Sequence, residues 1–160
     1  MQWQRINRSN PEKIFITVYN SYSTASLTNG QAVIWDYATD ANGVSVTKPT
    51  DATGRAGHYG SAFAGIAAET IAAGSYGLVQ VYGYHSAVRV RSWTAGQPAV
   101  AAGTGLTCPD ATFCLSSAPP NLPGGATSTV TVANYDWVAF ALAAQASWTT
   151  KAIACFIKAL

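Results

Sequence analysis

The sequence predicts an all-β protein, a small β-barrel or sandwich built from short antiparallel strands. Apolar and polar residues alternate with a period of two along most of the chain, which is the pattern of strands with one buried face. Glycine, proline and asparagine recur between these segments as turn signals, and little room is left for helices. We also expect an extended N-terminal arm and a C-terminal hairpin.

A chain of 160 residues is the size of one domain. We divide it into an N-terminal arm, residues 1–13, and a single β domain, residues 14–160, with an exposed Pro/Gly loop at residues 116–127. Only 10% of the residues are charged, and the formal net charge is +2. Such weak charge argues against a nucleic-acid-binding protein, and a surface with few charges favours assembly with other chains.

In the first half, segments rich in β-branched and aromatic residues lie between turn signals. Asn29-Gly30 marks one tight turn, and Asn42-Gly43 marks a second that closes a hairpin. The strands expected here cover residues 14–19, 32–37, 44–47, 62–67 and 76–85.

Residues 86–93 show the clearest alternation and predict a further strand. Val88 and Val90 face one way, whereas Arg89 and Arg91 face the other.

The C-terminal third is ambiguous. A short strand is expected at residues 112–115. Residues 136–147 are Ala-rich and would suit a helix by propensity, but bulky and small side chains alternate there, which favours a strand. We expect this strand to form a hairpin with residues 151–158. The polar centre of the region argues against a membrane span.

A weak internal repeat accompanies this hairpin. Residues 64–69, a turn and residues 77–81 resemble residues 139–144, a turn and residues 151–157. Each copy is a strand of alternating small and large residues, a short polar turn and a second apolar strand.

The three cysteines are too few for a disulfide scaffold. Cys108 and Cys114 flank a Pro-Asp turn, where a disulfide could link the two arms of a short hairpin. Synthesis in the cytoplasm would favour thiols instead. No cysteine or histidine pattern has the spacing of a zinc site, so we expect neither a metal nor another cofactor.

Sequence motifs of common enzymes are absent, and only two histidines are present, so we do not expect an enzyme. His58 and His85 are interpreted as surface or contact residues. Asp40-Ala41-Asn42-Gly43 faintly resembles part of a calcium loop but lacks the closing glutamate, so a turn is favoured.

Aromatic residues in the β-rich region could form a platform on which sugars stack, although a core or subunit interface is the more ordinary role for them. The candidates are Trp35, Tyr37, Tyr76, Tyr82, Tyr84 and Trp93.

Two arginine pairs are candidates for binding a partner. Arg89 and Arg91 share one strand face, and Arg5 and Arg8 lie near the start, although arginines on a solvated surface need no such role. Trp3 is an aromatic residue in this polar arm, which suits anchoring to a neighbouring protein. The start has no apolar segment of the kind found in a signal peptide.

Several segments resemble the head decoration, or cement, proteins of tailed bacteriophages. The resemblance rests on residues 65–83, on the opening at residues 3–7 and 10–13 with residues 29–33, and on the ending at residues 138–142 and 154–158. In that family a "G-x-A-x-E, turn, G-x-V-x-V-x-G" hairpin recurs in a β-barrel-like domain.

The resemblance implies a protein made in the host cytoplasm that binds the outer surface of the expanded head and stabilises it. Its partners would be the major capsid protein and further copies of itself, most plausibly as a trimer, with neither nucleic acid nor membrane involved. The alternative is a tail or fibre component, or a receptor- or glycan-binding module of the virion.

Overall fold

The computed structural model describes residues 12–49, 62–92, 99–108, 112–117, 137–145 and 149–159, and all of its regular elements there are strands. The predicted all-β class is therefore confirmed. The strands are β1 (Lys13–Asn20), β2 (Ala32–Trp35), β3 (Ser45–Thr47), β4 (Phe63–Ala67), β5 (Tyr76–Arg91), β6 (Gly105–Thr107), β7 (Leu115–Ser117), β8 (Ala139–Ala141) and β9 (Lys151–Lys158).

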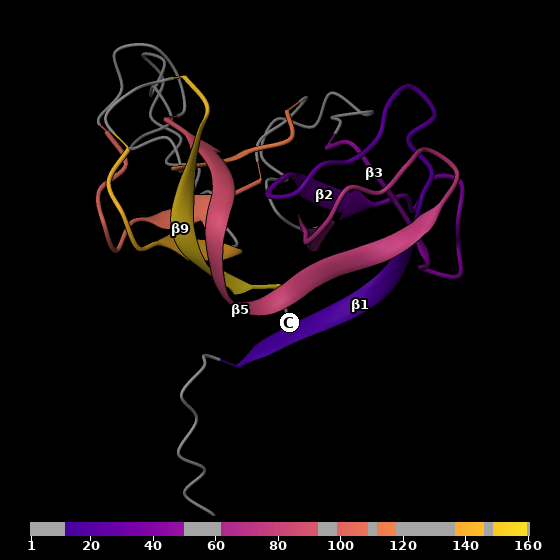
Figure 1. Cartoon of the computed structure of the whole chain (residues 1–160), viewed down its shortest axis with the longest axis horizontal. Coiled ribbons are helices and arrows are strands. Elements are labelled where there is room, and N and C mark those ends of the chain that lie inside the picture. Colours follow the sequence, from indigo (N-terminus) through magenta and orange to yellow (C-terminus); the bar gives the residue numbers. More distant parts are fainter. Residues whose placement is uncertain are drawn as a thin grey trace, which may run out of the picture.

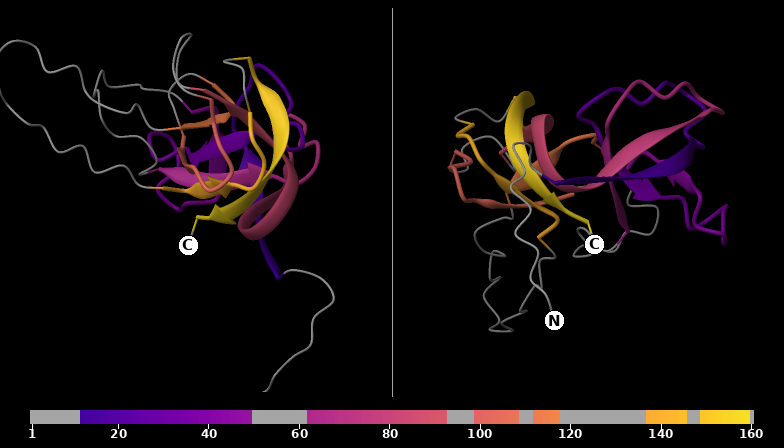
Figure 2. Two further views of the ribbon diagram at one scale, coloured as in Figure 1. Left: turned by 90° about the vertical axis from the view of Figure 1, so that its left-hand side faces the viewer. Right: turned by 60° about the horizontal axis from the view of Figure 1, so that its bottom comes forward.

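The strands pair into two closed circuits that share β5. In the first circuit the order is β1-β3-β2-β4-β5, and β5 pairs back with β1. In the second the order is β5-β7-β6-β8-β9, and β9 pairs back with β5. The two circuits lie toward opposite ends of the long axis of the molecule (Figures 1 and 2). The architecture is therefore neither one barrel nor a purely antiparallel sheet, because β1–β3 and β5–β7 are parallel.

The two circuits repeat one topology, with β1 to β5 corresponding to β5 to β9. In each, the first strand is parallel to the third, and every other pairing is antiparallel. An isolated bridge joins Leu27 to Ile71 in the first circuit, and an equivalent bridge joins Val100 to Gln145 in the second. These pairings confirm the internal repeat that the sequence suggests.

β5 is one strand of 16 residues, where the sequence predicted two. Its first part pairs with β1 and β4, and its last part pairs with β9 and β7. Gly83, at a φ of 98°, and a register irregularity between His85 and Val88 accompany the bend that carries β5 from one circuit into the other (Figure 1). The two adjoining strands expected at residues 76–85 and 86–93 are one, because β5 keeps strand partners on both sides of its irregularity.

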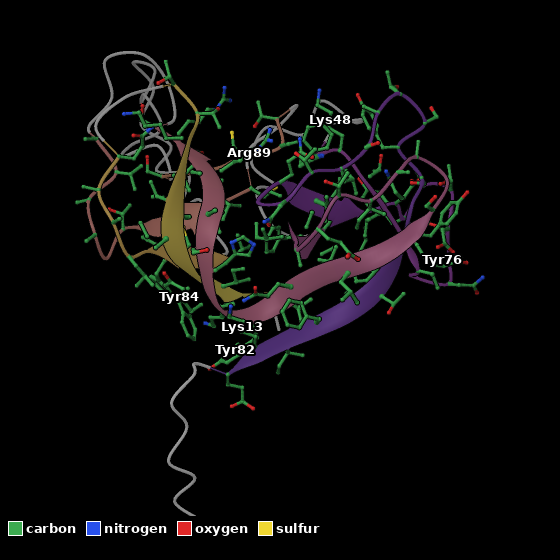
Figure 3. The ribbon with its side chains drawn as sticks, viewed as in Figure 1. Lys13, Lys48, Tyr76, Tyr82, Tyr84 and Arg89 are labelled. Atoms are coloured by element: carbon green, nitrogen blue, oxygen red, sulfur yellow. The ribbon has the colours of Figure 1, made fainter. Side chains whose placement is uncertain are left out.

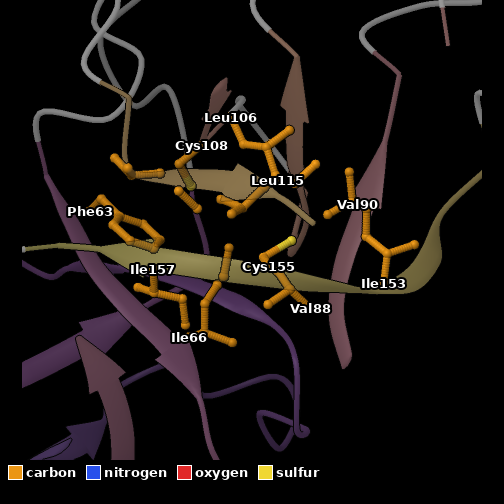
Figure 4. Close-up of a cluster of buried hydrophobic side chains, with 14 of the residues drawn as sticks. Phe63, Ile66, Val88, Val90, Leu106, Cys108, Leu115, Ile153, Cys155 and Ile157 are labelled. Carbon is orange, nitrogen blue, oxygen red and sulfur yellow. The ribbon is translucent and has the colours of Figure 1, made fainter. Parts of the chain in front are cut away.

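Two apolar cores correspond to the two circuits. The smaller one fills the first circuit and includes Val18, Leu27 and Val33. The larger one fills the second circuit and also takes in Phe63 and Ile66, which point away from the first core. Figure 4 shows these two β4 side chains beside Ile157 and Cys155 of β9. The outer face of the β2–β4 pair is thus buried against the second circuit.

Several predicted boundaries shift. β1 begins at Lys13, the last residue assigned to the arm, and residues 1–11 lie outside the described chain. Ser116 and Ser117 belong to β7 and not to the predicted loop, whose remainder is outside the described residues. The ambiguous segment forms strand β8, paired with β9 as the expected C-terminal hairpin.

The disulfide between Cys108 and Cys114 is absent from the structure, which holds both as buried thiols. The β6–β7 register pairs Thr107 with Ser116, and its continuation sets Cys108 opposite Leu115 in the larger core. Cys114 follows the alternation of Ser116 toward the other face, and its Sγ lies 3.3 Å from an oxygen of Thr112. The two thiols therefore have different surroundings in the structure.

In the described part of the chain, no helix has the length and apolar character needed to cross a membrane.

Candidate interaction surface

The most exposed large apolar side chains of the second circuit lie on or beside β8. Trp137, Phe140 and Leu142 are 48%, 37% and 48% exposed, whereas Ala139 and Ala141 are fully buried in the core. The Trp137 ring covers Gly105 of β6, where a Cβ atom would overlap it, and stacks on Phe140 at 6.4 Å between ring centroids. The bulky face of this strand is therefore outside and the small face inside.

Aromatic side chains continue this surface across β9 onto β5. Phe140 is paired with Phe156, which is paired in turn with Tyr84. Tyr82 meets Phe156 edge to face at 5.1 Å, and Lys13 Nζ lies 5.8 Å from the Tyr84 ring centroid. Figure 3 shows Tyr82, Tyr84 and Lys13 together near the bend of β5. We call this surface the aromatic face: Trp137, Phe140, Leu142, Phe156, Tyr82 and Tyr84.

A second apolar surface lies on β1 and the start of β5. Tyr76 and Leu78 are 67% and 41% exposed, and Phe15 is 42% exposed. The rings of Tyr76 and Tyr19 lie 5.2 Å apart. Tyr76 is the first residue of β5, whereas Tyr82 and Tyr84 lie near the bend in the middle of this strand (Figure 3).

The six aromatic residues suggested by the sequence therefore do not form one platform. Trp35 is packed partly against the first core, Tyr37 is exposed beyond β2, and Trp93 lies outside the described residues. Sequence reasoning missed Trp137 and Phe140. The sequence does show bulky and alanine residues in alternation along β8. This pattern predicts a strand but does not tell which of its two faces is buried.

The two β5 arginines face away from the core, as the alternation predicts, while Val88 and Val90 are fully buried in it. Arg89 Nη2 donates a hydrogen bond of 2.7 Å to Thr28 Oγ1, which links the two circuits. This contact gives Arg89 a role within the chain.

Arg91 lies in a polar row across three strands. It is paired with Ser116 of β7, which is paired with Thr107 of β6. Within the part of the chain that the structure describes, Arg91 Nε, Ser116 Oγ and Thr107 Oγ1 are buried without a hydrogen-bond partner. The other proposed contact residues, Trp3 and two arginines of the arm, Arg5 and Arg8, lie outside the described residues.

The carboxylate of Asp40 holds the backbone of a turn. Asp40 accepts backbone hydrogen bonds from Asn42, Val44 and Ser45 at 2.9, 3.0 and 2.7 Å, and these bonds, that of Asn42 foremost, lower its pKa. The residues that faintly resembled a calcium loop thus form a turn. Among the described residues, no group of three His, Cys, Asp or Glu side chains could hold a metal ion.

His85 is buried beside the bend in β5. Its Nδ1 accepts a hydrogen bond of 3.1 Å from the amide of Ala87. Burial lowers the pKa of His85 below the usual 6.5, and the positive charge of Lys13 lowers it further. Near neutral pH the imidazole is therefore uncharged and supports the irregular part of β5. The other histidine, His58, lies outside the described residues.

No family model and no curated protein matches the chain. Among solved structures it is similar to the N base of the head fiber gp8.5 of bacteriophage phi29, with a TM-score of 0.45 and 11% sequence identity. That comparison covers 92% of this chain and 96% of the other.

Proposed function

We propose that this chain is a structural protein of a tailed-phage virion, and specifically a decoration protein on the outside of the expanded head. The segments that resemble the cement family support this role. The observation that carries it is the exposure of Trp137, Phe140 and Leu142 on a sheet face. Large apolar side chains grouped on an exposed face are typical of protein interaction sites.

Stabilisation would follow from selective binding. A protein that binds the expanded lattice and not its precursor adds its binding free energy to the expanded state alone. The major capsid protein would be the partner, and Trp3, Arg5 and Arg8 of the arm would supply one anchor. This role requires no catalytic group and no cofactor.

The direct test is co-sedimentation of the purified full chain with undecorated expanded heads and with unexpanded precursor heads. We expect saturable binding to expanded heads alone. Deletion of residues 1–10 is expected to lower occupancy while the β-sheet signal in circular dichroism is retained. Absence of binding to either kind of head would contradict the proposal.

A glycan-binding role is the second candidate, because the stacked and exposed pair of Trp137 and Phe140 resembles a surface on which sugar rings stack. A glycan array with the full chain tests it. Specific hits that disappear in Trp137→Ala, together with no binding to heads, would favour this candidate over the decoration role.

A further inference from the structure

The internal repeat allows each surface of the second circuit to be compared with its equivalent in the first. The β2–β4 register pairs Ala32 with Ile66, and the β6–β8 register pairs Gly105 with Phe140. Ile66 and Phe140 are therefore equivalent positions. Three residues earlier in the chain in each case, Phe63 at the start of β4 corresponds to Trp137 just before β8.

These equivalent positions differ in their surroundings. Phe63 and Ile66 are 7% and 0% exposed and belong to the core cluster of the second circuit. Trp137 and Phe140 are 48% and 37% exposed. In the first circuit this face is covered by the second circuit. In the second circuit the equivalent face, at Trp137 and Phe140, is exposed.

The adjoining turns show the same difference. Gly30 and Gly103 have φ angles of 84° and 85° and precede β2 and β6. Gly30 is buried: its carbonyl accepts a bond of 2.8 Å from the amide of Arg89, and an added Cβ would overlap the Ala87 carbonyl. Gly103 is exposed, and an added Cβ would meet no atom within 4 Å.

The uncovered face consists of Trp137, Phe140 and Leu142 with the turn at residues 101–103, and none of these described residues is charged. The exposed Lys158, two residues beyond Phe156 on the same face of β9, lies at its edge. We propose that a second copy of this chain covers it, with the same face of each copy meeting around a rotation axis. An uncharged apolar face meets its own copy without repulsion between like charges, as a symmetric contact requires. In the first circuit the equivalent side chains, Phe63 and Ile66, are covered by another circuit of the same chain.

Self-association of the full chain, measured by sedimentation velocity over a wide concentration range, tests the proposal. We expect the wild type to associate reversibly. Phe140→Lys and Leu142→Lys place a charge on the face without altering the core and should weaken association roughly tenfold or more. Tyr37→Lys and Tyr76→Lys, at exposed aromatic residues of the first circuit, are matched controls and should leave association unchanged.

Thermal unfolding of each variant at low concentration checks that the fold is retained. A wild type that stays monomeric would overturn the proposal, as would association that is insensitive to both face variants. A monomeric wild type whose face variants lose binding to expanded heads would assign the face to the capsid protein instead. The proposal does not depend on head binding, so it can fail while the proposed function stands. If it holds, contact with the head uses other surfaces, such as the arm and the exposed Phe15, Tyr76 and Leu78.

Discussion

At the scale of single residues, His85 shows how burial gives a side chain a pH-dependent effect on stability. The folded state keeps the imidazole neutral, because burial and the nearby Lys13 charge both disfavour its protonated form. In the unfolded chain the same group titrates with its ordinary pKa of 6.5. Between the lowered folded pKa and 6.5 the unfolded state therefore binds more protons than the folded state.

We expect the free energy of unfolding to decrease as the pH falls below 6.5 and through the folded pKa of His85. His85→Gln removes the titrating group and should reduce this decrease, as seen in urea denaturation at a series of pH values. His58→Gln is the control, since it changes the only other histidine. If the free energy of unfolding of His85→Gln depends on pH as strongly as that of the wild type, groups other than His85 cause the loss of stability at low pH.

The cysteines show a second effect of burial at this scale. Burial raises the pKa of the Cys155 thiol to about 12, so it remains protonated and unreactive in the folded protein. Cys155 is an apolar packing residue of the larger core, beside Ile153 and Ile157 on the same face of β9.

At the scale of elements, the turns at Gly30 and Gly103 allow two effects on stability to be distinguished: local backbone strain and contact between the circuits. Gly30 and Gly103 share a left-handed backbone that disfavours any residue with a Cβ. Only Gly30 also approaches the β5 backbone, at Ala87.

Gly103→Ala should therefore lower the free energy of unfolding only by the local backbone strain, about 1–2 kcal/mol. Gly30→Ala should lower the free energy of unfolding by the same strain and by about 1–3 kcal/mol more, because its Cβ atom would overlap β5. Chemical denaturation of both variants measures the difference. Equal losses would mean that the Gly30 turn can move away from β5 at no cost.

β8 shows why an alternating pattern alone does not assign the buried face. Ala139 pairs with Leu106 on one side and Ile157 on the other, and all three are fully buried. Small side chains on β8 leave room for larger ones from neighbouring strands inside a narrow circuit. The bulky residues consequently face outward, where they form part of the aromatic face.

At the scale of the whole molecule, the shared strand and the larger core join the two circuits. β5 supplies pairings to both circuits, and Phe63 of the first lies in the core of the second. Loss of either circuit would expose apolar surface and unpaired backbone of the other, which favours cooperative unfolding.

We therefore expect one unfolding transition, with tryptophan fluorescence and far-UV circular dichroism giving the same midpoint. Leu27→Ala and Leu106→Ala, at fully buried positions of the first and second circuit, should each lower stability by about 2–5 kcal/mol and shift both probes together. Two separate transitions, each shifted by only one of these variants, would show that the circuits unfold independently.

The all-β class, most strand positions and the internal repeat could be predicted from the sequence alone. These follow from local properties: the alternation of side chains along an extended backbone, and the glycine and asparagine turns between segments. The strand at Lys13–Asn20 and the C-terminal hairpin were predictable on this basis.

How the strands combine depends on contacts between segments that are distant in the chain. The continuity of β5 depends on its pairing with both β1 and β9, which are far apart in the chain. The different surroundings of Cys108 and Cys114 depend on the β6–β7 register, and the exposure of Trp137 and Phe140 depends on which face of the second circuit is closed off. Each is set by contacts between distant segments, to which a local pattern of residues is insensitive.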